Sequence, residues 1–348
     1  MPAVDLKQFA AAPVRILVVK LSSFGDIVHV TGALRALRRA LPLADLTLAV
    51  ESRWADVVRN NPNLNALMES SSLEFSIAYV AEVRRLLSRQ RRFDIAIDFQ
   101  GTRRSAAWVY LSGARFKMGR GSFRPGWRFS VETDRTRHAI VICAEVCARA
   151  GVPVDDPDPE IYTSHEDERL LDESLDAERI PRAGYVLVNP FSRWVSKSWP
   201  KQDAAAFIRQ YKQGFDDHLI LTGGVDDQAR AESLLRLLPP GTIRSLVGRL
   251  PLAQALCLFR RARLMVSCDS GPMHAAAAFG VPVVALFGPT HPEHTGPWGP
   301  NHCVVQALRP LDHHTYRTDT NASYMRALES DTVFNAVAAK LDALRGAA

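Results

Sequence analysis

The sequence predicts an α/β protein made of two doubly wound domains, each a parallel sheet covered by helices. Three observations support this fold class. The chain has 348 residues, more than one typical domain. Apolar runs rich in valine, isoleucine and leucine alternate with helix-period segments throughout. Prolines and a densely acidic segment interrupt this series between residues 152 and 180. Continuous apolar strands, each followed by a helix, are typical of parallel sheets buried on both faces.

The strands and helices are predicted from the same pattern. Strands are expected at 14–19, 46–50, 94–99, 185–190, 218–223, 263–268 and 281–288. Helices are expected at 26–40, 75–90, 202–213, 226–237 and 252–262. A final amphipathic helix at 330–346 places Val333, Val337, Leu341 and Leu344 on one stripe. We therefore predict a first domain over 1–165, a linker or helix over 166–179 and a second domain over 180–325.

Composition describes an ordinary globular protein with a modest basic excess. The hydrophobic fraction is 47%, the net charge is +6 and the pI is about 9.2, which suggests an acidic partner. Five cysteines without a CxxC pair indicate buried thiols in a reducing, cytosolic setting. The first residues lack a signal-peptide pattern, and no apolar run reaches the length of a membrane span.

The strongest motif is "SCDSGPMHAAAAFGVPVVALFGPT", where a predicted strand ends and a helix of small residues begins. Gly271 allows a close backbone approach, and the free amides of the first helical turn point at an anion. His274 lies about one turn further on and can donate to the same ligand. The alternative is an ordinary strand–turn–helix that Ser270 caps.

A second loop, "NPFSRWVSKSWP", places Ser192, Arg193 and Lys197 after another strand. A hydroxyl and two cations there can neutralise a diphosphate without a metal. The "TGG" at Thr222–Gly224 is a weaker signal, since paired glycines usually mark a turn. Neither GxGxxG nor GxxxxGK[ST] occurs, which argues against a dinucleotide oxidoreductase and a P-loop NTPase.

The loop "KLSSFGDIVH" after the first strand carries a single carboxylate, Asp26. Gly25 permits a tight turn, while Ser22 and Ser23 can cap or bond locally. Asp26 is either the N-cap of helix 26–40 or a general base that reaches a substrate. Asp26→Asn keeps a cap and removes a base, so if Asp26 is the base this variant should lose activity with little loss of stability.

The stretch from 101 to 131 has seven basic residues and no acidic one, with aromatic residues interleaved. Three explanations stay open: a solvated basic face, a nucleic-acid surface, or a site for an acidic, phosphorylated glycolipid near a membrane. No nucleic-acid recognition motif accompanies it, so we expect no nucleic-acid partner, and the composition leaves the other two explanations open. No DxD pair follows a strand, and His291 and His294 are interpreted as part of a shaped loop, so no metal ligands are predicted.

Taken together, "KLSSFGDIVHVTGALRALRRALP", "DFQGTRRSA", "SKSWP" and "CDSGPMHAAAAFGVPVVALFGPT" resemble the motifs of the lipopolysaccharide heptosyltransferases, glycosyltransferase family 9. The resemblance implies the GT-B fold, two Rossmann-like domains with the active site in the cleft between them. It also implies inverting, metal-independent transfer of heptose from ADP-heptose to a Kdo-lipid A type acceptor, with no cofactor. The resemblance further implies a monomer that is cytoplasmic and peripheral to the inner face of the bacterial cytoplasmic membrane.

The resemblance also assigns roles to residues. Asp26 matches the catalytic base, and Lys197 would stabilise the leaving diphosphate. The second domain would bind the donor through Ser192, Arg193, Thr222, Gly223, Leu250 (against the adenine), Asp269, Ser270, Gly271 and His274. The first domain would bind the acceptor through Ser22, Ser23, Gly25, Gln100, Arg103, Arg104, Arg120 and Arg124.

The family pattern is lost over 301–329, where Tyr324-Met325 replace a Cys-Met pair. Two alternatives therefore stay open. One is a family 9 transferase with another nucleotide-sugar donor or a non-lipopolysaccharide acceptor. The other is a GT-B sugar-nucleotide enzyme or binding module that does not perform transfer.

Overall fold

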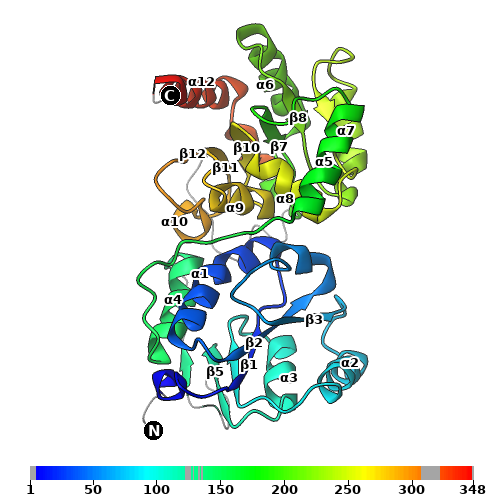
Figure 1. The fold of residues 1–348 in the computed structure, drawn as a ribbon. Coiled ribbons are helices and arrows are strands. Elements are labelled where there is room, and N and C mark those ends of the chain that lie inside the picture. The colour runs from blue at the N-terminus through cyan, green and yellow to red at the C-terminus, as the bar shows by residue number, and fades with distance from the viewer. Residues whose placement is uncertain are drawn as a thin grey trace. The chain divides into compact units, whose positions relative to one another are not determined.

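The computed structural model describes residues 5–121, 127, 129–131, 134, 136–306 and 322–346. The chain divides into two compact units, Met1–Tyr162 and Thr163–Ala348. Within the described residues each unit contains one six-stranded sheet, and the paired strands of both sheets run parallel. The fold class predicted from the sequence is confirmed: two doubly wound α/β units, the architecture of the GT-B fold (Figure 1).

The first unit has the strand order β3-β2-β1-β4-β5-β6. Its strands are β1 (Arg15–Val19), β2 (Asp45–Glu51), β3 (Ala66–Ser70), β4 (Ile95–Asp98), β5 (Phe116–Arg120) and β6 (Phe129–Val131). Its helices are α1 (Phe24–Ala40), α2 (Ile77–Ser88), α3 (Arg103–Leu111) and α4 (Ala139–Arg149), with 3₁₀ turns at Leu6–Phe9 and Ser52–Val57. Helix α1 packs on α4, and α2 packs on α3.

The second unit has the strand order β12-β11-β10-β7-β8-β9. Its strands are β7 (Val186–Asn189), β8 (Leu219–Leu221), β9 (Arg244–Ser245), β10 (Leu264–Cys268), β11 (Val283–Phe287) and β12 (Cys303–Gln306). Its helices are α5 (His165–Ala177), α6 (Lys201–Gly214), α7 (Gln228–Leu235), α8 (Leu252–Arg260), α9 (Gly271–Ala278), α10 (Pro292–Thr295) and α12 (Ser330–Gly346). Short 3₁₀ turns lie at Val195–Lys197, Val225–Asp227 and Ala322–Ala327.

Each sheet is buried because its central strands are apolar on both faces. The side chains of Leu17 and Val19 on β1 pack with Trp108 of α3 and Tyr79 of α2, all of them fully buried. Full burial of an aliphatic side chain contributes about 1.5–3 kcal/mol, so these central strands hold each unit together. All seven predicted strands are present within two residues of their expected bounds.

The strands that the pattern did not predict lie mainly at sheet edges. β3, β6, β9 and β12 are the outermost strands, and β5 pairs with the edge strand β6. An edge strand has one neighbour and is partly exposed, so its sequence carries polar residues and no continuous apolar run. The burial pattern of β12, with only Val305 buried among its four residues, illustrates this.

The segment around 166–179 is a helix. Helix α5 buries Leu171 and Leu175 and packs on α8, so this acidic segment belongs to the second unit. The predicted final helix is confirmed as α12, in which Val333, Val337 and Leu341 are fully buried and Leu344 packs beside them.

All five cysteines are free, and Cys143 and Cys147 are buried on α4 as small apolar side chains. Burial raises the pKa of both thiols, which leaves them protonated and unreactive near neutral pH. Within the described part of the chain, no helix has both the length and the apolar character needed to cross a membrane.

Candidate active site

Asp26 lies in the first turn of α1, directly after the central strand β1. The N-cap of α1 is Ser23, and the helix begins two residues earlier than predicted. The hypothesis that Asp26 is itself the N-cap is therefore wrong. Its Oδ2 accepts hydrogen bonds from the Ser23 amide at 3.2 Å and the Ser23 hydroxyl at 2.9 Å, in the manner of a capping box.

The other oxygen of Asp26 faces a buried lysine. Lys20 Nζ lies 3.2 Å from Asp26 Oδ1 and also donates to the Phe99 carbonyl at 3.5 Å. Lys20 is only 2% exposed, whereas 41% of the Asp26 side chain is exposed. Removal of the carboxylate from water would raise its pKa, but Lys20, His29 and the bonds from Ser23 together bring the pKa well below its ordinary value. Asp26 is thus an ionised, partly open carboxylate.

The loop after β4 lies beside the Asp26 loop because β4 and β1 are paired. The Ser22 amide donates to Gln100 Oε1 at 3.3 Å and so connects the two loops. The buried Asp98 accepts from the amides of Gln100 and Gly101 and from the Ser105 hydroxyl, at 2.8–2.9 Å. Asp98 was not predicted as a functional residue; the "DFQG" sequence after a strand was its only signal. It orders the loop that carries Gln100.

The predicted acceptor arginines have different surroundings. Arg103 is exposed at the start of α3. Arg104 donates to the fully buried Glu51 at 2.6 Å and lies over the Tyr79 ring. Arg120 is half-buried and lies against Gly101, where an added Cβ would be 3.4 Å from the Arg120 side chain. Arg124 lies outside the described residues. Arg104 therefore has a structural role inside the unit, whereas the exposed Arg103 is accessible to a ligand.

The second unit holds a buried ion pair where β10 meets α9. Lys197 Nζ lies 2.8 Å from Asp269 Oδ2, and the Thr290 hydroxyl donates to the same oxygen at 2.8 Å. Both members of the pair are largely buried, at 14% and 6% exposure. Burial acts to raise the pKa of Asp269, but Lys197, the nearby His274 and the bonds from Lys197 and Thr290 lower it below its ordinary value.

Helix α9 begins with Gly271 and has Pro272 in its first turn, as predicted. The alternative, in which the Ser270 side chain caps this helix, is not found: its hydroxyl donates to the Cys268 carbonyl at 3.1 Å and accepts from Asn189 Nδ2 at 3.2 Å. Ser270 instead forms a polar cluster with Asn189 and Ser267, at the ends of two paired strands. The first amides of α9 are thus not occupied by a side-chain cap.

The loop that carries Lys197 is held by contacts that the sequence did not reveal. The Ser192 hydroxyl donates to the Asp269 carbonyl at 3.3 Å, and the Ser192 amide donates to Ser198 Oγ at 3.0 Å. Arg230 of α7 donates to the Ser192 carbonyl and to Ser198, and it pairs with Asp227. Only tertiary packing brings α7 to this loop, so no local motif could have identified Arg230.

The remaining predicted donor residues differ in exposure. Thr222 is buried, and a Cβ at Gly223 would lie 2.9 Å from the Phe191 ring, so only glycine fits there. Leu250 is half-buried just before α8, and Arg193 is exposed over the Trp194 ring. His274 is 7% exposed on α9.

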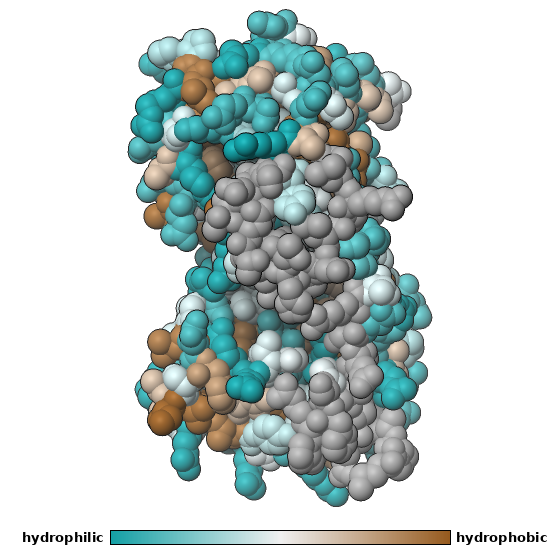
Figure 2. Space-filling model, turned by 180° about the vertical axis from the view of Figure 1, so that it is seen from behind, coloured by the Kyte–Doolittle hydropathy of each residue, from teal (hydrophilic) through white to brown (hydrophobic). Residues whose placement is uncertain are grey.

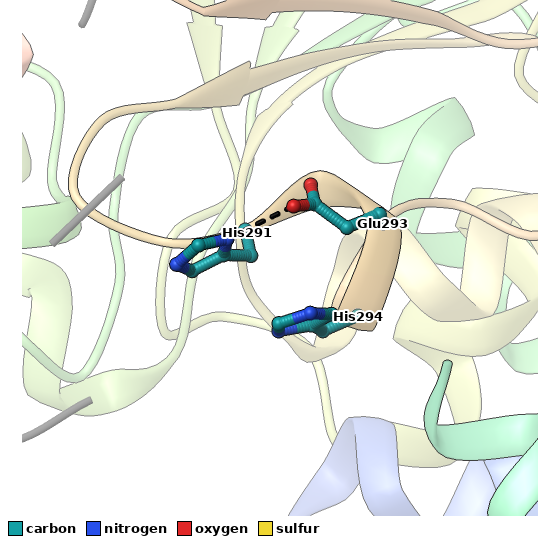
Figure 3. A group of neighbouring side chains, drawn as sticks. All are labelled: His291, Glu293 and His294. Atoms are coloured by element: carbon teal, nitrogen blue, oxygen red, sulfur yellow. Dashed lines mark hydrogen bonds and ion pairs between the residues drawn. The ribbon is translucent and has the colours of Figure 1, made fainter. Parts of the chain in front are cut away.

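One group of side chains in the described residues has the spacing of a metal site: His291, Glu293 and His294, shown in Figure 3. His291 Nδ1 and Glu293 Oε1 are 2.9 Å apart, and this bond is the main reason why the pKa of Glu293 is lowered. The two imidazole rings are stacked, with centroids 4.6 Å apart and planes 15° apart. A metal binds in the plane of an imidazole ring, so stacked rings do not converge on one ion without rotating.

Two α/β units, each with its own six-stranded parallel sheet, are the architecture of the GT-B glycosyltransferases. The chain belongs to glycosyltransferase family 9 (heptosyltransferase), whose family model matches residues 80–325. It is therefore a glycosyltransferase, and the alternative of a binding module without transfer is not supported.

Known proteins match over most of their length. The lipopolysaccharide heptosyltransferase 1 of Pseudomonas aeruginosa is 29% identical over 300 residues, 82% of this chain and 81% of the relative. A crystal structure of a family 9 glycosyl transferase from Veillonella parvula has a TM-score of 0.85 at 22% identity and covers 94% of this chain and 97% of its own. The E. coli ADP-heptose lps heptosyltransferase II has a TM-score of 0.73 at 20% identity, with coverages of 92% and 98%.

Proposed function

We propose that this protein transfers heptose from ADP-heptose to an acidic, Kdo-lipid A type acceptor of the lipopolysaccharide inner core, with inversion and without a metal. The observation that carries the proposal is the Lys197–Asp269 pair at the start of α9. Support for the substrates comes from the names of similar proteins, which include a lipopolysaccharide heptosyltransferase 1 and the E. coli ADP-heptose lps heptosyltransferase II.

In this proposal the second unit binds the donor. Departure of ADP places negative charge on the diphosphate, which requires positive groups at that point. An ammonium has three N–H donors, so Lys197 can keep its bond to Asp269 and also donate to a phosphate oxygen. The Gly271 amide and the dipole of α9 add to this stabilisation. These groups supply what a divalent cation supplies in other transferases.

The first unit binds the acceptor and supplies the base. Asp26 takes the proton of the acceptor hydroxyl while that oxygen forms a bond to the anomeric carbon. The bond from the anomeric carbon to the diphosphate breaks on the opposite face, and ADP leaves with the electron pair. In this proposal Gln100, which accepts from the Ser22 amide, contacts the sugar of the acceptor, and Arg103, exposed at the start of α3, contacts its acidic groups. The enzyme would work at the cytoplasmic face of the inner membrane, where the acceptor lipid is embedded.

The donor is tested by isothermal titration of the protein against ADP, UDP, GDP and CMP in the presence of EDTA. We expect selective binding of ADP, which is lost in Lys197→Ala. A preference for another nucleotide contradicts the donor assignment, and binding that requires a divalent cation contradicts the metal-independent mechanism.

A further inference from the structure

Three large apolar side chains stand exposed on one short segment of the first unit. Leu73, Phe75 and Ile77, here called the 73–77 loop, are 47%, 49% and 91% exposed. They alternate with Glu74 and Ser76 and lead into α2. Helix α2 lies at the right of Figure 1, so it lies at the left of Figure 2, where apolar side chains gather on the surface of this unit. Such a patch marks an interaction surface.

The exposed side of α2 adds positive charge to this patch. Arg84, Arg85 and Arg89 are exposed, and no carboxylate of the described residues lies within ion-pair distance of them. The acidic residue of the helix, Glu82, is occupied by the amide and hydroxyl of Ser71, at 2.9 and 2.6 Å. The exposed apolar side chains of the 73–77 loop and the unpaired arginines beside them are complementary to a surface with an apolar interior and an anionic exterior.

The 73–77 loop is connected to the acceptor side of the unit by direct contacts. The Phe75 ring lies 6.5 Å from the Tyr79 ring, and the Arg104 guanidinium lies 4.9 Å over Tyr79. Arg104 also donates to the Ser71 carbonyl at 3.3 Å. The 73–77 loop and the start of α3, which carries Arg103, therefore both lie at the carboxyl ends of the strands.

We propose that the 73–77 loop and the arginines of α2 dock the protein on an anionic lipid bilayer. The alternating apolar residues enter the headgroup region, and Arg84, Arg85 and Arg89 lie against lipid phosphates. The inference deepens the proposed function, since it names the surface that brings Asp26 to a membrane-embedded acceptor. A protein partner with a hydrophobic pocket would not require the row of unpaired arginines.

Flotation with vesicles tests the proposal. The full-length protein is mixed with vesicles of phosphatidylethanolamine and phosphatidylglycerol, or of phosphatidylcholine alone. We expect binding to the anionic vesicles that falls about tenfold or more in the triple variant Leu73→Ser/Phe75→Ser/Ile77→Ser and falls steeply in about 0.5 M salt. Arg84→Glu/Arg85→Glu should give the same loss. The matched control is Val225→Ser, which removes a 67% exposed apolar side chain from the second unit and should bind as wild type does.

The proposal is overturned if wild-type protein does not float with anionic vesicles, or if the triple variant floats equally well. It is also overturned if sedimentation velocity shows that the wild-type protein is a dimer and that the triple variant is a monomer. The 73–77 loop would then be a contact between two copies of the chain. Turnover with a water-soluble Kdo oligosaccharide separates this proposal from the proposed function. The triple variant should keep wild-type turnover on that acceptor, whereas failure of the wild type there counts against the proposed function alone.

Discussion

The ammonium of Lys20 lies 3.2 Å from Oδ1 of Asp26, and the lysine is almost completely buried while the carboxylate is partly open. The pair keeps Asp26 ionised at neutral pH, which a base requires. It also makes Asp26 a weak base in the resting protein, since its pKa is strongly lowered. Proton transfer must then be late, when the new bond to carbon has made the acceptor hydroxyl acidic.

Asp26→Asn should abolish most of the transfer activity, with kcat lower by about 10²–10⁴-fold. The structure also changes the stability expected from the sequence. Asparagine leaves the buried Lys20 ammonium without its carboxylate, so we expect unfolding to become easier by about 1–3 kcal/mol in urea denaturation. The double variant Asp26→Asn/Lys20→Met should recover stability and stay inactive. An active single variant would refute the role of Asp26 as the base.

Lys20→Met should move the acid limb of kcat/KM to higher pH. The pKa of Asp26 is lowered by Lys20, so loss of the ammonium raises it, and protonation inactivates the base at a higher pH. The stability of the folded protein also depends on pH through the lowered pKa of Asp26. A carboxyl group with a lowered folded-state pKa adds stability above its ordinary pKa of about 3.8 that is lost as the pH falls below it, and Lys20→Met removes this contribution. An acid limb that stays in place would contradict the pairing.

Lys197→Ala should lose ADP binding and also destabilise the second unit. Removal of the ammonium leaves the buried Asp269 without its ion pair, which costs about 3–5 kcal/mol. The double variant Lys197→Met/Asp269→Asn should regain most of that stability because no buried charge is left unpaired, yet it should not bind ADP. Denaturant titration and calorimetry separate the two effects, and recovery of ADP binding in the double variant would exclude a direct contact of Lys197 with the diphosphate.

Arg103 and Arg104 should give opposite results although they are neighbours. Arg103→Ala removes an exposed cation, so the KM for the acceptor should rise about tenfold with an unchanged melting temperature. Arg104→Ala takes a partner from the fully buried Glu51, so the melting temperature should fall by several degrees, at a cost of about 1–3 kcal/mol. Equal losses of stability in both variants would contradict this assignment.

His291→Ala/His294→Ala tests the possible metal cluster. The stacked rings do not converge on an ion, so turnover measured in EDTA should equal turnover without it, in both the variant and the wild type. A loss of wild-type turnover in EDTA that Zn²⁺ or Mn²⁺ restores, and that the variant does not show, would reveal a metal site at these residues.

The sequence predicted what depends on local pattern. Strands such as β1 and β10 are mostly apolar, and the segments that follow them carry Asp26 and Asp269, as expected for parallel sheets. Partners from distant segments were not predictable. Lys20 could be recognised as buried only after β1 was placed at the centre of its sheet, and Arg230 reaches the Lys197 loop through the packing of α7.

The prediction from sequence also failed for residues whose type fits two different roles. The start of α1 was misplaced by two residues because Ser23 and Asp26 are both good capping residues, and only the backbone shows that Ser23 is the N-cap. Arg104 was grouped with the other basic residues of 101–131, since its partner Glu51 lies far away in the sequence, at the end of β2. Charge counts along a sequence do not show which arginines are already paired.

The most direct test is the product formed from ADP-heptose and a Kdo-lipid A acceptor by the purified protein in EDTA, analysed by mass spectrometry and NMR. The account predicts one added heptose, an anomeric configuration inverted from that of the donor, release of ADP, and no product with Asp26→Asn. Retention of configuration, or release of free heptose without a glycolipid product, would contradict it.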